Sequence, residues 1–343
     1  MKVGFVFDPI YLEHDTNQHA ECVSRLTATM DYLQNTGLIQ ELTQIKARAA
    51  TVEEIALVHD MRLINHVKAT AGEGGGWLDA DTVISARSYD AALFAAGGTI
   101  KAAEAVMNKE VDSAFALVRP PGHHATRRQS MGFCLFNNIA ITTKYIIQKY
   151  QLDRVLIVDF DVHQGNGTQE AFETDPRVMY ISTHQHPFYP GSGAVEEIGS
   201  GKAQGTKINI PLPAGCGDKE YLKVFEEIII PVARRFSPQL MLVSAGYDIH
   251  WSDPLAQMQA TTTGVARMVW IINALAGELC QGRLALTLEG GYNLNALATS
   301  IKATFDVLLG KKSIEDKLGP PQYARTADIT NLITELKAIH KLA

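Results

Sequence analysis

The segment VLIVDFDVHQGN, residues 155–166, decides the fold class of this protein. Its first five residues form a short run of the kind that is apolar on both faces and typical of a strand buried in a parallel sheet. The residues that follow are mostly polar and include Asp161 and His163. Ligands bind outside the carboxyl ends of the strands in open parallel sheets. A buried strand that runs into titratable residues therefore predicts an α/β protein with a functional site at that edge.

The same pattern repeats along the chain. Short apolar runs bounded by turn residues predict further strands at residues 3–8, 113–118, 178–182, 240–245 and 284–289. Apolar residues at spacings of three and four predict helices at residues 25–35, 61–69, 88–107, 137–149, 219–236 and 263–280. This alternation predicts one domain with a mostly parallel central sheet and helices on both of its faces.

The two ends of the chain differ in character. No segment has the composition of a linker between domains, so residues 1–309 are predicted to form one domain. Residues 310–343 are predicted to be a polar extension with a helix at residues 331–342, packed on the domain or trailing from it. Thr51 and Glu54 form a capping-box pattern, which predicts the start of a short helix. The glycine-rich residues 72–76 predict a mobile surface connection.

Composition and charge exclude several classes of protein. The chain has 343 residues, of which 46% are hydrophobic and 20% charged, so it is neither disordered nor fibrous. Its net charge of -6 argues against nucleic acid as a ligand but is compatible with a cationic substrate. The four cysteines lie far apart without a Cys-x-x-Cys pair, which favours a reducing compartment. Because there is neither a signal peptide nor an apolar run of about eighteen residues, we expect a cytoplasmic protein without a membrane anchor.

A metal site is predicted from three residues that follow two of the strands. Asp161 and His163 are two residues apart in an extended segment, so their side chains point to the same side. Asp248 supplies a third ligand from the end of a different strand. Three protein ligands leave one position open for water, which marks a catalytic rather than a structural site. The alternative, a capping or surface Asp-x-His pair, is disfavoured by the titratable residues at the other strand ends.

Two consecutive histidines, His123 and His124, follow the rigid turn Pro-Pro-Gly. We predict that one or both flank the water at the metal site and shuttle its proton. Asp159 and Asn166 are the natural hydrogen-bond acceptors behind them, since such partners fix the tautomer and the orientation of a histidine. The alternative is a half-buried pair with no role in chemistry.

A tyrosine is the predicted donor to the substrate. Tyr292 lies in the segment Glu-Gly-Gly-Tyr-Asn, where two glycines allow a tight turn and leave the phenol free to reach into a cleft. Its hydroxyl can then donate a hydrogen bond to a developing oxyanion. A tyrosine packed in the core is the alternative.

Other polar residues are assigned to the surroundings of the site. Asp81 and His250 are predicted to line its mouth, and Glu21 and Arg25 to support its floor. His14, His19, His59, His66 and His340 are predicted to be ordinary surface or loop residues, and His184 and His186 to have structural or rim roles.

Five segments together resemble the histone deacetylase family, on its class II side with the bacterial amidohydrolases and acetylpolyamine amidohydrolases. They are RPPGHHA at residues 119–125, GFCLFNN at 132–138, DFDVHQGNGTQ at 159–169, SAGYDIHWSDPL at 244–255 and LEGGYNL at 288–294. The similarity runs from about residue 1 to residue 309. It implies a deacetylase domain with a single parallel sheet. The implied activity is a zinc-dependent hydrolase that releases acetate from N-acetylated amines such as acetyl-lysine side chains.

The resemblance also implies a role for individual residues. The zinc ligands would be Asp161, His163 and Asp248. His124 would be the general base and acid with His123 as its electrostatic partner, and Tyr292 would polarise the acetyl carbonyl. An internal potassium site would involve Asp159, Asp161, His163, Ser182 and Thr183. Gly132, Phe133, Tyr189 and Leu255 would line the acyl channel.

Departures from the family pattern refine these expectations. Asn166 stands where class I members have aspartate, which places the chain nearer class II. Tyr292 is retained where some vertebrate class II members have histidine, so activity is expected. Leu255 stands where polyamine-selective members place an acidic gatekeeper, which favours acetyl-lysine over a polyamine.

Several alternatives stay open at this point. The substrate could be an acetylated polyamine, the site could be an arginase-like binuclear centre, or the chain could be an inactive module that binds acyl-lysine. Two carboxylates and one imidazole suit either zinc or ferrous iron. A homo-oligomer is compatible with the sequence.

Overall fold

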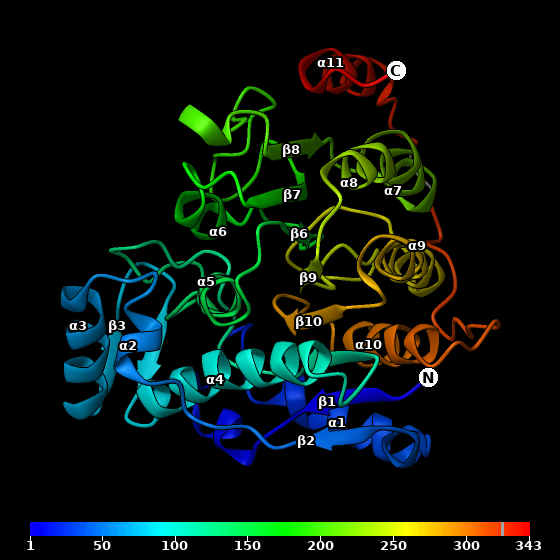
Figure 1. Ribbon diagram of the computed structural model, residues 1–343. Helices are drawn as coiled ribbons and strands as arrows, with labels where there is room; N and C mark the ends of the chain where they lie inside the picture. Colours follow the sequence, from blue (N-terminus) through cyan, green and yellow to red (C-terminus); the bar gives the residue numbers. More distant parts are fainter. Residues whose placement is uncertain (324–325) are drawn as a thin grey trace.

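The computed structural model describes residues 1–323 and 326–343. Its centre is an eight-stranded sheet in the order β2-β1-β5-β10-β9-β6-β7-β8, in which neighbouring strands pair in parallel (Figure 1). The strands are β1 Val3–Val6, β2 Thr43–Ile45, β5 Ser113–Ala116, β6 Val155–Asp159, β7 Val178–Gln185, β8 Lys207–Leu212, β9 Leu240–Ala245 and β10 Leu284–Leu288. The predicted α/β fold is confirmed.

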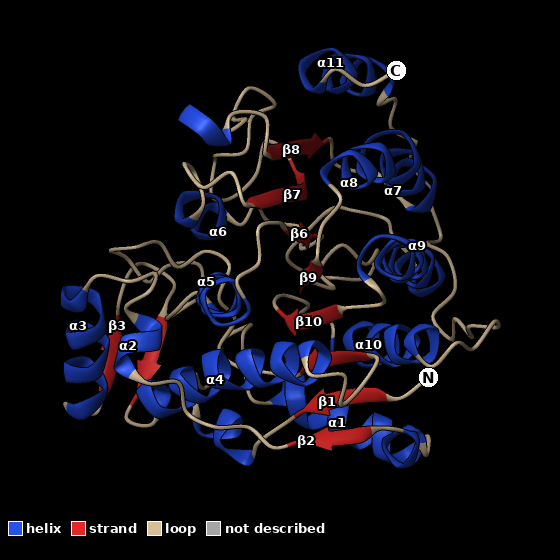
Figure 2. Cartoon of the chain, in the orientation of Figure 1, coloured by secondary structure: helices blue, strands red, loops and turns tan. Residues whose placement is uncertain are grey.

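Helices form two layers, one against each face of this sheet (Figure 2). One layer holds α2 Val52–Ile55, α3 Met61–Gly72, α4 Ser88–Met107, α5 Asn138–Tyr150 and α6 Asn166–Ala171. The other holds α1 Ser24–Asn35, α7 Asp218–Val224, a π-helical turn at Phe225–Ile229, α8 Ile230–Phe236, α9 Thr262–Cys280 and α10 Leu294–Leu308. Strands β6, β9 and β10 are buried along their whole length because both of their faces are covered.

Most predicted strands and helices are present, and the capping box of Thr51 and Glu54 is formed. The elements missing from the prediction include β2, β8 and α10. β2 is only three residues long, and β8 contains a proline, which is typical of a strand at the edge of a sheet. α10 was also missed, although its buried Leu297, Ile301, Phe305 and Leu308 repeat at helical spacings.

Two other predictions are wrong. Gly75 and Gly76 are not part of a mobile connection but belong to β3 (Gly75–Trp77), which pairs antiparallel with β4 (Val83–Ser85). Glycine is required at residue 75, because its φ is +109° and a Cβ atom there would lie 2.3 Å from the carbonyl oxygen of Ile84. Three of the five histidines assigned to the surface or to loops, His14, His59 and His340, are buried.

The C-terminal segment carries one further helix, α11 (Thr330–His340). It packs against the π-helical turn, where Lys337 forms an ion pair of 2.9 Å with Glu227. Arg235 of α8 donates to the carbonyl oxygen of His340 at 2.6 Å. The division of the chain at residue 309 stays a prediction. Among the helices of the described residues, none is long and apolar enough to cross a membrane.

The packing of α4 on α5 is cross-linked by Glu104, whose carboxylate accepts from Tyr145 at 2.7 Å and from Lys149 at 2.5 Å. Burial alone would raise the pKa of Glu104, but its partners, Lys101 among them, lower it to about 2. A carboxylate whose pKa is lowered in the folded state stabilises the fold at pH values above its ordinary pKa. This stability is lost as the pH falls from about 4.5 to 2.

We therefore expect Glu104→Gln to reduce the free energy of unfolding at pH 7 by about 1–2 kcal/mol. This figure allows for the solvent that screens the charges of Lys101 and Lys149. The deficit should shrink as the pH is lowered through this window. Urea denaturation between pH 2.5 and 7 measures it, with the exposed Glu226→Gln as the control. A deficit that does not change with pH would contradict this account of Glu104.

Candidate active site

The polar segments that follow four neighbouring strands meet at one edge of the sheet. β5, β10, β9 and β6 lie side by side in parallel, so their carboxyl ends face the same way. The segments after them line a cavity of about 210 Å³. Its lining residues are Asp81, Pro121, His123, His124, Gly132, Phe133, His163, Tyr189, Leu255, Gly290 and Tyr292. The topology thus brings together residues that are far apart in the chain.

Asp161, His163 and Asp248 form a candidate metal site beside this cavity. One ligand atom from each lies within 4.8 Å of the others. Nδ1 of His163 lies 3.1 Å from Oδ1 of Asp161 and 3.4 Å from Oδ2 of Asp248. Within the described residues, Oδ2 of Asp248 accepts no hydrogen bond although it is buried. A buried carboxylate oxygen without a donor is costly unless it binds a cation, so these residues fit a divalent metal ion.

Glycines hold the two carboxylates close together. A Cβ atom on Gly246 would lie 2.0 Å from Oδ2 of Asp161, and one on Gly290 would lie 2.1 Å from Oδ2 of Asp248. The N–H group of Gly290 also donates to Asp161 at 2.8 Å. Any larger residue at either position would therefore displace a candidate ligand.

The charges of this group favour a bound cation. Burial and the nearby Asp161 raise the pKa of Asp248 to about 7, because two carboxylates are buried close together. Burial alone would lower the pKa of His163, but its contacts with Asp161 and Asp248 raise it to about 9. A divalent cation would neutralise both carboxylates and allow His163 to bind as the neutral imidazole.

His124 has the environment of a neutral base. Its Nδ1 lies 2.8 Å from Oδ1 of Asn166, which can only accept, so Nδ1 carries the proton and Nε2 is free to take another. Burial and the positive charges of His123 and His163 hold the pKa of His124 well below its ordinary value. At neutral pH this histidine is thus ready to accept a proton.

His123 has the opposite character. Its Nδ1 lies 3.1 Å from Oδ2 of Asp159. Burial alone would lower the pKa of His123, but the charges of Asp161 and Asp159 raise it to about 10. Its ring centroid lies 4.0 Å from that of His124. The structure therefore places both histidines against the acceptors predicted for them. His123 is the charged member of the pair and His124 the neutral one.

Tyr292 lines the same cavity and is supported by Arg25, as predicted for the floor of the site. The guanidinium carbon of Arg25 lies 5.0 Å from the centre of the Tyr292 ring. Arg25 also donates to the carbonyl oxygens of Glu289 at 2.5 Å and Gly291 at 2.7 Å, and Glu21 accepts from it at 3.1 Å. Burial raises the pKa of the Tyr292 phenol well above its ordinary value, so the hydroxyl keeps its proton and can donate it in a hydrogen bond.

The four predicted channel residues, Gly132, Phe133, Tyr189 and Leu255, all line the cavity. Gly132 has a φ of +56°, and a Cβ atom on it would lie 2.4 Å from Cδ2 of His124. Asp81 is at the cavity as predicted. His250 is not, because it is buried and faces Ser252 and Thr262 instead.

Residues that the sequence analysis missed support this arrangement. Phe188 stacks on His163 with the ring centres 5.1 Å apart. Glu289, at the end of β10, accepts from the N–H groups of Gly122 at 2.7 Å and His123 at 3.2 Å and so holds the segment with the two histidines. A glutamate at the end of a predicted apolar strand was the sequence signal that could have indicated it.

The predicted potassium-site residues also lie together. Asp159 on β6 is paired in register with Ser182 on β7, and Thr183 follows on the same strand. All three are buried, and Oγ1 of Thr183 forms no hydrogen bond to the described residues. Potassium at this position stays a proposal.

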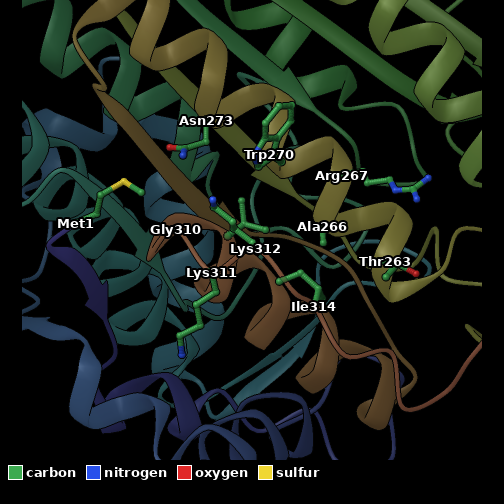
Figure 3. A pocket seen from close by; sticks show the side chains of 11 residues that line it. Met1, Thr263, Ala266, Arg267, Trp270, Asn273, Gly310, Lys311, Lys312 and Ile314 are labelled. Carbon is green, nitrogen blue, oxygen red and sulfur yellow. The ribbon is translucent and has the colours of Figure 1, made fainter.

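A larger cavity, of about 590 Å³, lies elsewhere on the molecule. Figure 3 shows that its walls include Arg267 and Trp270 of α9 and Lys312 from the segment after α10. None of the strand-end histidines and aspartates lines it. The smaller cavity is therefore the better candidate for chemistry.

Comparisons with known proteins agree on one family. The sequence model of the histone deacetylase domain matches residues 19–308. A probable deacetylase of Archaeoglobus fulgidus is 44% identical over 86% of this chain and 82% of its own length. Histone deacetylase 14, chloroplastic, of Arabidopsis thaliana is 40% identical over 96% of this chain and 83% of its own. The crystal structure of the HDA15 HD domain superposes with a TM-score of 0.88 and 36% identity, covering 99% of this chain and 94% of that one.

Proposed function

The chain belongs to the histone deacetylase family, and from this premise we propose that it is a zinc-dependent deacetylase acting on acetylated lysine side chains. Membership makes it a hydrolase of the deacetylase class with a candidate metal site at Asp161, His163 and Asp248. One observation carries the finer proposal. The three ligands lie beside a cavity that is also lined by the neutral His124 and by the protonated Tyr292.

Asp161, His163 and Asp248 would hold zinc, which would supply a Lewis acid for the acetyl carbonyl and lower the pKa of water toward neutrality. His124 accepts the proton of the attacking water at Nε2, and Asn166 fixes the ring in the tautomer that permits this. Tyr292 donates to the carbonyl oxygen as negative charge develops on it. His124 then returns the proton to the nitrogen of the leaving amine, and acetate departs. His123, whose ring centroid lies 4.0 Å from that of His124, would add positive charge near the developing negative charge.

The walls of the cavity favour a substrate with an apolar stem. Phe133, Tyr189 and Leu255 line it with aromatic and aliphatic groups, which suit the methylene chain of a lysine. The position of Asp81 in the cavity lining favours the second candidate, an acetylated polyamine. Its carboxylate could bind an ammonium group of the polyamine that lies away from the acetylated nitrogen. Among the described residues there is a single candidate metal-binding group, which consists of three residues. A second such group, which would favour a binuclear centre, is not found among them, so an arginase-like centre has no support.

The choice between lysine and polyamine is tested by acetate release from an acetyl-lysine peptide and from an acetylated polyamine at equal concentration. We expect a higher kcat/KM for the peptide, since Leu255 offers no charge to a second amine. A higher kcat/KM for the polyamine would keep the mechanism and reject the proposed substrate. Asp81→Asn is the matched variant, because it should weaken only the substrate that carries a second cation.

The remaining assignments extend this proposal. Zinc is favoured over ferrous iron by the family mechanism, and potassium is proposed for the site at Asp159, Ser182 and Thr183. A cytoplasmic location and the option of a homo-oligomer stay predictions.

A further inference from the structure

Asp253 lies in the loop after β9 and connects two walls of the active-site cavity. Its side chain is buried, with 6% of the residue exposed, and does not line the cavity itself. Oδ2 accepts from the N–H groups of Tyr292 at 2.7 Å and Asn293 at 3.2 Å. Oδ1 accepts from the N–H group of Leu255 at 2.9 Å. One carboxylate therefore joins the backbone of Tyr292 to the backbone of Leu255, and both of these residues line the cavity.

A second contact joins the same two loops in the opposite direction. Nδ2 of Asn293 donates to the carbonyl oxygen of Ser252 at 3.0 Å. Oδ1 of Asn293 accepts from the N–H group of Ala296 and so caps the start of α10. The residue after Tyr292 is thus anchored both to the Asp253 loop and to a helix.

The carbonyl groups that precede Tyr292 are held from the other side. Arg25 donates to the carbonyl oxygens of Glu289 and Gly291. Gly291 has a φ of +116°, a conformation that glycine adopts readily and other residues disfavour, and the contacts of Arg25 hold this turn in place. Arg25 holds carbonyl oxygens, whereas Asp253 accepts from the N–H group of Tyr292 itself.

A carboxylate suits this position better than any neutral side chain. It offers acceptor sites on both oxygens and no donor, which matches three N–H groups. Burying such a charge is costly unless hydrogen bonds stabilise it. An amide of the same size would place an NH₂ group against at least one of the three N–H donors.

We propose that Asp253 is a positioning residue, which holds Tyr292 at the distance from the metal-ligand group at which the phenol can donate to the acetyl carbonyl. This role rests on the proposed function, since it acts through Tyr292. Misplacing a reacting group by about 1 Å can cost roughly 100-fold in rate. Asp253→Asn is therefore expected to lower kcat on the order of 10- to 100-fold.

A double-mutant cycle separates positioning from a general structural role. Tyr292→Phe alone should lower kcat/KM on the order of 100-fold, the effect of losing one oxyanion donor. In the Tyr292→Phe background, Asp253→Asn should cost less than about threefold, because the hydroxyl that it positions is already gone. Costs that simply add would overturn the proposal. Asp218→Asn is the control, since Asp218 also joins two segments, through Thr261, but lies outside the cavity lining.

Hydrogen exchange gives a readout that does not depend on activity. Asp253→Asn should accelerate amide exchange in a peptide covering residues 289–294, whereas Asp218→Asn should leave that peptide unchanged. Unchanged exchange in Asp253→Asn would overturn the proposal. If the wild-type protein released no acetate, the proposed function would fail, and accelerated exchange would still show that Asp253 holds this loop.

Discussion

Asp248→Asn is expected to lower zinc affinity and turnover each by more than about 100-fold. Removal of a residue that only hydrogen-bonds to a metal ligand already costs about 10- to 100-fold in metal affinity or activity, and Asp248 is a candidate ligand itself. The variant should nevertheless fold. Oδ1 of Asp248 accepts from the N–H group of Val162 at 2.9 Å, and an asparagine oxygen can do the same. Metal content after dialysis against limiting zinc and acetate release measure the two effects. One zinc ion per chain and normal turnover in the variant would contradict the assignment of Asp248.

Stability without metal provides a control for this variant. Burial and the charge of Asp161 raise the pKa of Asp248. A carboxylate whose pKa is raised in the folded state destabilises the fold once the pH exceeds its ordinary value, and the full cost applies above about pH 7. At pH 8 the metal-free variant should therefore resist urea at least as well as the metal-free wild type. Added zinc should stabilise only the wild type.

His124→Gln is expected to reduce turnover by about 10²- to 10⁴-fold, the range for loss of a general acid–base group. Glutamine is polar and of similar length, but its amide neither accepts nor releases a proton at neutral pH. Because His124 is not one of the three candidate ligands, the variant should still bind one zinc ion per chain. Acetate release and metal content, measured on the same preparation, separate proton transfer from metal binding.

His184→Gln is the matched control for that variant. His184 is also a buried histidine near a strand end, and it contacts Ser182 and the carbonyl oxygen of Gly193. It is absent from the cavity lining, so its replacement should affect stability more than turnover. Equal losses of turnover in the two variants would argue against a specific role for His124.

The sequence was informative where chemistry depends on local spacing. Asp161 and His163 could be paired because alternate residues of an extended segment share a side. Asp248 and Tyr292 could be added because parallel strands place their carboxyl ends at one edge. The acceptors behind the two histidines were also predicted, and the structure places Asp159 and Asn166 within hydrogen-bonding distance of them.

The sequence was less informative where a contact joins residues that are distant in the chain without a shared pattern. The contact of Asp253 with Tyr292 spans two loops, and the stacking of Phe188 on His163 depends on the path of an irregular segment. His250 follows a candidate metal ligand by two residues, but it is buried and its segment forms a bridge between His250 and Ala260. Neither propensity nor periodicity encodes such turns.

The central claim is that this site removes acetyl groups with the help of zinc. The most direct test is acetate release from an acetyl-lysine peptide by one preparation, measured after chelation and again after addition of one equivalent of zinc. The account predicts negligible release after chelation and full release once a single zinc ion per chain is bound. Acetate release that persists without metal would contradict it. So would the absence of acetate release, with zinc bound, from both the acetyl-lysine peptide and an acetylated polyamine.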